Sequence, residues 1–156
     1  MSVLVLGIGN LVMADDGVGV RVVQLLAGRH RFPEWVTVLD GGTLGLDLLP
    51  QLEGISKLLV VDAVECDGEP GTLVRLTGED IPLALQTKVS PHQMGLKDLL
   101  TVASLMGHTA DEMVLLGVKP GSIEMSMELT PAVQAQVEPL VELVLQELDR
   151  WGASPG

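Results

Sequence analysis

Three side chains of this 156-residue chain have the types and the placement to bind a divalent metal ion together. Asp16 lies in the glycine-containing stretch GIGNLVMADDGVG, Asp62 ends the apolar run KLLVVDAV, and His92 follows Ser-Pro in SPHQMGLKDLL. Two carboxylates and one imidazole accept a first-row ion such as nickel or zinc and leave coordination positions open. We therefore expect Asp16, Asp62 and His92 to form a metal site.

Each of these residues also has a structural explanation. Asp15 and Asp16 fall at the start of a predicted helix, where aspartate is a common cap, although one cap explains only one of the two. Asp62 has the position of a turn residue bonded to nearby backbone. His92 falls in the first turn of a predicted helix, whose dipole favours the neutral imidazole that a metal needs, but a lone histidine is also a common cap or core residue.

The glycines of the first stretch suggest a phosphate site as an alternative. A dinucleotide-binding turn requires a third glycine where this chain has Val12, and the Gly-Lys-Ser/Thr of a Walker loop is absent from the sequence. Asp15 and Asp16 would stand where a pyrophosphate binds and would repel it. The sequence therefore disfavours a dinucleotide-binding module.

A second glycine pair follows another acidic residue. Asp40 closes the run VTVLD and is followed by Gly41, Gly42 and Thr43. Two adjacent glycines permit a close backbone approach, either to a bound peptide or within a sharp turn. Of these two alternatives, we adopt the first as a prediction, in which Asp40, Gly41, Gly42 and Thr43 contact a substrate.

Other kinds of chemistry have little support in the sequence. The motifs Gly-x-Ser-x-Gly and His-Glu-x-x-His are absent, and Cys66 stands between Glu65 and Asp67, which disfavour its thiolate. A single cysteine excludes an internal disulfide and a cysteine-rich metal site. His30 and His108 have polar neighbours, so we expect them at the surface.

Composition limits the partners and the location. Nine basic and 21 acidic residues give a net charge of −12, which makes nucleic acid a poor partner. The N-terminus lacks the pattern of a signal peptide, and no apolar run approaches the ~18 residues that span a membrane. We expect a cytoplasmic protein without membrane insertion.

Strands and helices must alternate to position these residues. Apolar runs predict buried strands, and a short segment after the third of them predicts an antiparallel strand, because its link is too short for a crossover helix. The predicted strands are 3–9, 35–40, 57–64, 71–76 and 112–120. This pattern predicts a single α/β domain over residues 1–151, with a twisted, mainly parallel sheet of about five strands, helices on both faces, and a disordered tail at 152–156.

The predicted helices are 16–28, a short one within 41–52, one after Ser90, and a last one along 131–148. Ser90 and Thr130 are expected to cap the two later helices, and Pro139 is expected to bend the last one. Ligands of such folds bind beyond the carboxyl ends of the strands, where Asp16 and Asp62 fall.

Six segments of the chain occur in the order found in a known family. They are LGIGNLVMADDGVGVRVV, LDGGTLGLDLLP, VVDAV, SPHQMGLKDLL, LLGVKP and LTPAV. The chain resembles the hydrogenase maturation proteases, the endopeptidases that trim the large subunit of nickel-iron hydrogenases. It is most similar to the branch that serves membrane-associated or periplasmic uptake hydrogenases.

The resemblance implies an activity and a role for the three residues. The enzyme would remove a C-terminal extension from the large-subunit precursor after nickel insertion, and Asp16, Asp62 and His92 would contact that substrate-borne nickel or another divalent ion. Asp16 stands where relatives often have glutamate. Either the metal polarises the scissile carbonyl, or Asp16 or Asp62 is the general base. The free protein is expected to be a monomer; a nickel-binding chaperone without protease activity is the alternative.

Overall fold

Five strands form one sheet in the order β2–β1–β3–β5–β4. Four strands are parallel, and β4 pairs antiparallel with β5, as its short connection predicted. The strands are β1 (Val3–Ile8), β2 (Val36–Gly42), β3 (Lys57–Ala63), β4 (Leu73–Thr77) and β5 (Glu112–Val118). The computed structural model describes the backbone of residues 1–84 and 91–155 and the side chains of residues 1–82 and 96–155.

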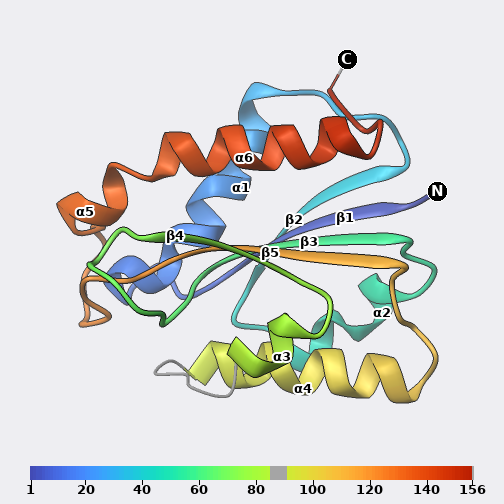
Figure 1. Cartoon of the computed structure of the whole chain (residues 1–156), viewed down its shortest axis with the longest axis horizontal. Helices are drawn as coiled ribbons and strands as arrows, with labels where there is room; N and C mark the ends of the chain where they lie inside the picture. Colours follow the sequence, from blue (N-terminus) through green and yellow to red (C-terminus); the bar gives the residue numbers. More distant parts are fainter. Residues whose placement is uncertain (85–90, 156) are drawn as a thin grey trace.

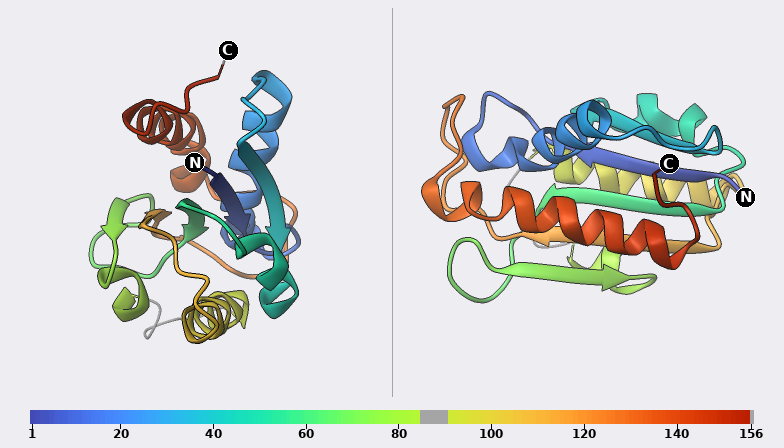
Figure 2. Two further views of the ribbon diagram at one scale, coloured as in Figure 1. Left: turned by 90° about the vertical axis from the view of Figure 1, so that its right-hand side faces the viewer. Right: turned by 90° about the horizontal axis from the view of Figure 1, so that it is seen from above.

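Helices cover both faces of the sheet (Figures 1 and 2). Two long helices lie on one face, α1 (Val18–Arg29) and α6 (Val137–Arg150), and the other face carries α2 (Leu49–Leu52), α3 (Asp80–Ala84) and α4 (Pro91–Leu105). The predicted fold class, a mainly parallel α/β sheet between helices, is confirmed. None of the helices in the described ranges is long and apolar enough to cross a membrane.

The strands are apolar at successive positions because both faces of the sheet are covered by helices. Val3 and Val5 of β1 pack in the core under α1 and α6, whereas Leu4 and Leu6 pack in the core under α4. Successive side chains of a strand point to opposite faces, so a strand covered on both sides must be apolar at every position. The same alternation holds along β3.

The last helix differs from the prediction. The chain forms α5 (Pro131–Gln134), breaks, and begins again as α6, so the predicted bend at Pro139 is wrong. Pro139 is the third residue of α6, where a backbone N–H would have no acceptor within the helix. Thr130 does precede α5, but its side chain makes no cap hydrogen bond there.

Two other predicted termini can be compared with the structure. α4 begins at Pro91 as expected, while Ser90, its predicted cap, lies outside the described residues. Within the predicted tail, Ala153 is fully buried in the α1–α6 core, and its N–H donates to the carbonyl of Leu148 at 2.7 Å. The chain therefore packs against the domain beyond the end of α6.

Candidate active site

Asp15 and Asp16 both lie in η1 (Ala14–Gly17), a short 3-10 helix between β1 and α1. Both are buried, with exposed fractions of 0% and 2%. Neither is a cap of α1, which begins at Val18 after Gly17. The helix-cap explanation considered above is therefore not what holds these two carboxylates.

The glycines around η1 serve close packing rather than phosphate binding. Gly9 has a φ of +142°, and a Cβ there would stand 1.9 Å from the carbonyl oxygen of Asp16. A Cβ on Gly19 would stand 2.0 Å from the carbonyl oxygen of Val61. Side chains are impossible at these distances, so glycine allows η1 and α1 to lie against the ends of β1 and β3.

Asp15 binds η1 to a loop that is distant in the sequence. Its Oδ2 accepts hydrogen bonds from the N–H of Gly121 at 2.7 Å, the N–H of Ser122 at 3.1 Å and the hydroxyl of Thr130 at 2.7 Å, and its Oδ1 accepts from the N–H of Thr130 at 2.7 Å. The hydroxyl of Thr130 thus donates to Asp15 and does not cap α5. Asp15 is a structural residue of the site.

The same loop, residues 119–130, makes further contacts with the chain before α1. The N–H of Ala14 donates to the carbonyl of Ser126 at 2.9 Å, and the N–H of Ser126 donates to the carbonyl of Val12 at 3.0 Å. A side-chain N–H of Arg21 donates to the carbonyl of Met127. The sequence did not predict this loop as part of the site, because its contacts join residues more than 100 positions apart.

Asp16 and Asp62 come from elements that touch each other. Oδ2 of Asp16 accepts from the N–H of Asn10 at 3.1 Å, and Oδ1 of the fully buried Asp62 accepts from the N–H of Ala63 at 2.8 Å. η1 packs against β3, so the structure brings the elements that carry the two predicted carboxylates together. Asp62 is the residue before the last of β3, and η1 follows β1, so both carboxylates lie at the carboxyl end of the parallel strands.

His92, the third predicted ligand, is the second residue of α4, and its side chain lies outside the described residues. α4 begins at the end of the sheet where η1 lies (Figure 1). Within the described part of the chain, no three His, Cys, Asp or Glu side chains are grouped to hold a metal ion. The metal site therefore stays a prediction.

Three of the four predicted substrate residues, at the end of β2 and immediately after it, border a cleft of about 240 Å³. Asp40, Gly42 and Thr43 line it together with residues 9–11 and Val20, so the cleft adjoins the Asn10 N–H that holds Asp16. Asp40 accepts from the N–H of Gly42 at 3.0 Å. Gly41 instead faces the core, where a Cβ would stand 2.8 Å from Leu6.

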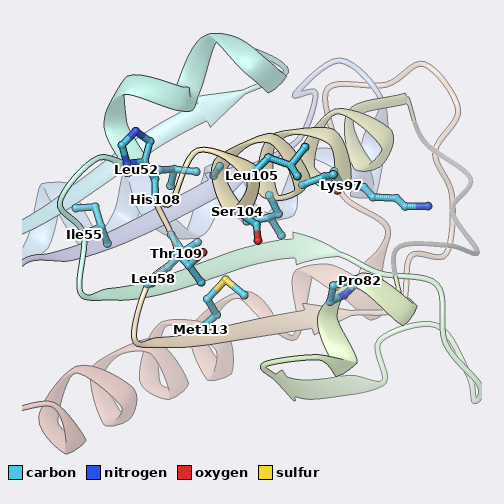
Figure 3. Close-up of a pocket in the computed structure, with 14 residues that line it drawn as sticks. Leu52, Ile55, Leu58, Pro82, Lys97, Ser104, Leu105, His108, Thr109 and Met113 are labelled. Carbon is cyan, nitrogen blue, oxygen red and sulfur yellow. The ribbon is translucent and has the colours of Figure 1, made fainter.

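A larger pocket, of about 330 Å³, lies between α4 and the opposite ends of β3 and β5 (Figure 3). Leu52, Leu58 and Met113 make most of its wall apolar, and the half-buried His108 lies at its edge rather than free at the surface. This pocket is remote from the carboxylates and contributes nothing to the candidate site.

Cys66 is unsuited to nucleophilic attack. Burial raises the pKa of its thiol, Glu65 and Asp67 raise it further, and Lys119 opposes them. Lys119 itself pairs with Glu65 at 3.0 Å and donates to the carbonyl of Cys66 at 2.6 Å. The thiol therefore stays protonated at neutral pH, which agrees with the expectation from its acidic neighbours.

Comparison with known sequences gives matches along most of the chain. The model of a family described as hydrogenase maturation protease matches residues 20–147. The hydrogenase 2 maturation protease of Escherichia coli (strain K12) is 40% identical over 153 residues, which are 97% of this chain and 93% of that protein. The hydrogenase expression/formation protein HupD of Rhodobacter capsulatus is 44% identical over 152 residues, 96% of this chain and 72% of that protein.

Solved structures give the same result. The hydrogenase maturating endopeptidase HybD from E. coli has a TM-score of 0.94 at 40% identity, covering 99% of this chain and 96% of that one. The [NiFe] hydrogenase maturation protease HybD from Thermococcus kodakarensis has a TM-score of 0.77 at 32% identity, covering 92% and 97%. The fold is thus shared with these proteins.

Proposed function

The chain belongs to the hydrogenase maturation protease family, and from this premise we propose that it removes a C-terminal extension from the nickel-loaded large-subunit precursor of a nickel-iron hydrogenase. The observation that carries the proposal is the pair of buried carboxylates, Asp16 and Asp62, on two touching elements at the carboxyl end of the sheet. A cleft lined by Asn10, whose N–H bonds Asp16, lies beside this pair, and in our proposal it receives part of the substrate peptide.

Nickel enters this proposal as part of the substrate. The carboxylates of Asp16 and Asp62 and the imidazole of His92 are donors that a first-row ion accepts. A precursor that holds its nickel with ligands of its own needs only a few more from the protease. Contact with that ion would then distinguish a loaded precursor from an empty one, because only the loaded one gains these bonds.

Peptide hydrolysis needs a base for the attacking water. In our proposal a carboxylate of Asp16 or Asp62 takes a proton from water while the water oxygen bonds to the scissile carbonyl carbon. The carbon–nitrogen bond then breaks, and the same carboxyl group returns the proton to the leaving amine. The substrate's nickel supplies Lewis-acid polarisation of the carbonyl in one version and recognition alone in the other.

The alternative is a nickel-binding chaperone that cleaves nothing. Family membership favours the protease, since the matched family and the solved relatives carry protease or endopeptidase in their descriptions. Action in the cytoplasm as a free monomer belongs to the same proposal. The single cysteine, which cannot form an internal disulfide, fits a reducing compartment.

The experiment combines the purified protein with its candidate precursor, loaded or unloaded with nickel, and weighs the products by mass spectrometry. We expect loss of a C-terminal peptide from the loaded precursor only. His92→Ala should abolish that loss, while His30→Ala, which changes a histidine in the loop after α1, should leave it intact. Equal cleavage of loaded and unloaded precursor would contradict nickel recognition, and tight nickel binding without cleavage would support the chaperone.

A further inference from the structure

Exposed aliphatic side chains are concentrated at the end of the sheet that carries the candidate site. Of the eight large hydrophobic residues exposed among the described side chains, five lie on segments that follow β1, β2 and β5. We call these five the apolar rim; they are Val12, Leu44, Leu46, Met125 and Met127. The other three lie at the N-terminus and at the end of α4, and they are Met1, Leu105 and Met106.

Met125 and Met127 are the most exposed members of the rim, at 83% and 61%. They flank Ser126, whose N–H and carbonyl are both bonded to the chain before α1. Val12 belongs to the same contact, because its carbonyl accepts from Ser126. These backbone hydrogen bonds hold the segment in a conformation that leaves the three apolar side chains exposed. Exposure of apolar side chains to water is unfavourable.

Leu44 and Leu46 lie on the segment that leaves the cleft after β2. Their exposed fractions are 54% and 49%, and Thr43, immediately before them, lines the cleft. Leu11, next to Val12, lines the same cleft. The rim is thus continuous with the cleft from two segments, which joins it to the site instead of scattering it over the surface.

Acidic side chains border the rim. Glu124 and Glu128 are exposed on either side of the two methionines, and Asp47 follows Leu46. A complementary partner would present apolar side chains with lysine or arginine around them. Methionine suits such a contact, because its flexible, polarisable side chain adapts to an apolar surface.

We propose that the apolar rim is the docking surface for the large-subunit precursor and binds an apolar patch bordered by basic residues. This inference rests on the proposed function. It adds a second contact between protease and precursor, separate from the contact of the carboxylates with the scissile bond and the nickel. The rim would contribute to affinity for the precursor, and the carboxylates to the chemical step.

The test compares two double variants with the wild type. Met125→Ser/Met127→Ser changes the rim, and Leu105→Ser/Met106→Ser removes equally exposed apolar side chains at the opposite end of the sheet. We expect the rim variant to raise KM for the nickel-loaded precursor about tenfold or more, with kcat within about twofold. The control variant should change neither by more than about twofold, and both should melt within about 2 °C of the wild type.

Salt provides a second readout. If basic residues of the precursor face Glu124 and Glu128, raising the salt concentration should increase KM, and Glu124→Gln/Glu128→Gln should weaken that dependence. An unchanged KM in the rim variant would overturn the proposal. Self-association through the rim would also overturn it. Sedimentation would then show the wild type as a dimer and the rim variant as a monomer.

The same measurements distinguish a failure of the proposed protease function from a failure of the proposed docking surface. If the wild type binds the precursor without cutting it, protease action on that precursor is contradicted, and the Kd of the rim variant still tests docking. If the wild type cuts the precursor and the rim variant cuts it with the same KM, only the docking surface is contradicted. If the wild type neither binds nor cuts it, both proposals are overturned for that precursor.

Discussion

Buried carboxylates occur at both ends of the sheet, but they are held differently. At the carboxyl end, the described hydrogen bonds of Asp16 and Asp62 come from backbone N–H groups. Near the amino end of β5, Glu147 is paired with the guanidinium groups of Arg75 and Arg150. The comparison separates two settings of one residue class: arginines pair with the buried carboxylate at the amino end and stabilise the fold there, whereas backbone N–H groups bond the two carboxylates at the carboxyl end, to which we assign the chemistry in our proposal.

Two glutamates, Glu112 and Glu147, form a cluster with Arg75 and Arg150 near the amino end of β5, and we call it the amino-end cluster. Burial raises the pKa of Glu147, but hydrogen bonds from Arg75 and Arg150 outweigh burial and hold that pKa below its usual value. The hydrogen bond from Arg150 lowers the pKa of Glu112 as well, and Trp151 Nε1 donates to the same carboxylate at 3.0 Å. These contacts join β4, β5 and α6, so the cluster ties one helical layer to the edge of the sheet.

The largest effect that we expect comes from Asp62. Asp62→Asn keeps the size of the side chain and its acceptor for the N–H of Ala63, but it removes the charge. Cleavage of the nickel-loaded precursor should fall about 1,000-fold, as expected for loss of an acid–base or metal-contacting group, while Tm changes by less than about 2 °C. A full rate in the variant, measured by mass spectrometry, would exclude Asp62 from the chemistry.

Asp15 should give the largest loss of stability. Asp15→Ala removes the acceptor of the N–H groups of Gly121, Ser122 and Thr130 and of the Thr130 hydroxyl. The free energy of unfolding, measured in urea, should fall by about 3–5 kcal/mol, because buried donors lose a charged acceptor. A loss under about 1 kcal/mol would contradict the structural role.

A smaller effect is expected at the other end of the sheet. Glu147→Gln leaves Arg75 and Arg150 without one carboxylate, but both arginine side chains are 45% exposed and can turn to water. The free energy of unfolding should fall by about 1–2 kcal/mol. The cleavage rate should stay within twofold of the wild type, and a tenfold loss would contradict the separation between the two ends.

The smallest effect is a pH dependence. The pKa values of Glu112 and Glu147 are lowered by folding, so their contribution to stability is fully present above the usual glutamate pKa of 4.5 and is lost as pH falls through the lower folded values. Tm should therefore decline below about pH 4.5. Glu112→Gln/Glu147→Gln should decline less steeply over the same range; an equal slope would show that other carboxylates govern the decline.

Much of the fold was predictable because its signals are local. Continuous apolar runs located the buried strands, and the short connection before β4 identified its antiparallel direction. The break between α5 and α6 was not predictable from apolar spacing, since Val133 and Val137 are four residues apart and fit one continuous helix. Pro139 carried the better signal, because proline is favoured in the first turn of a helix.

The site was predictable only in part. The carboxyl-end rule selected Asp16 and Asp62, and the structure brings their elements together. The role of Asp15 was hidden, because its partners lie 106–115 positions away in the sequence and no local pattern marks them. Sequence reasoning placed Asp16 in the metal site and offered Asp15 no role beyond a helix cap, whereas the folded loop shows which groups Asp15 binds.

The most direct test of this account therefore compares Asp15→Asn with Asp16→Asn, measuring Tm and the cleavage rate of nickel-loaded precursor for each. We predict that Asp16→Asn melts within about 2 °C of the wild type and loses about 1,000-fold in rate. Asp15→Asn should melt roughly 5 °C lower and, below its Tm, cleave within tenfold of the wild type. The reverse pattern, a stable but inactive Asp15→Asn beside an unstable but active Asp16→Asn, would contradict the assignment of structure to one aspartate and chemistry to the other.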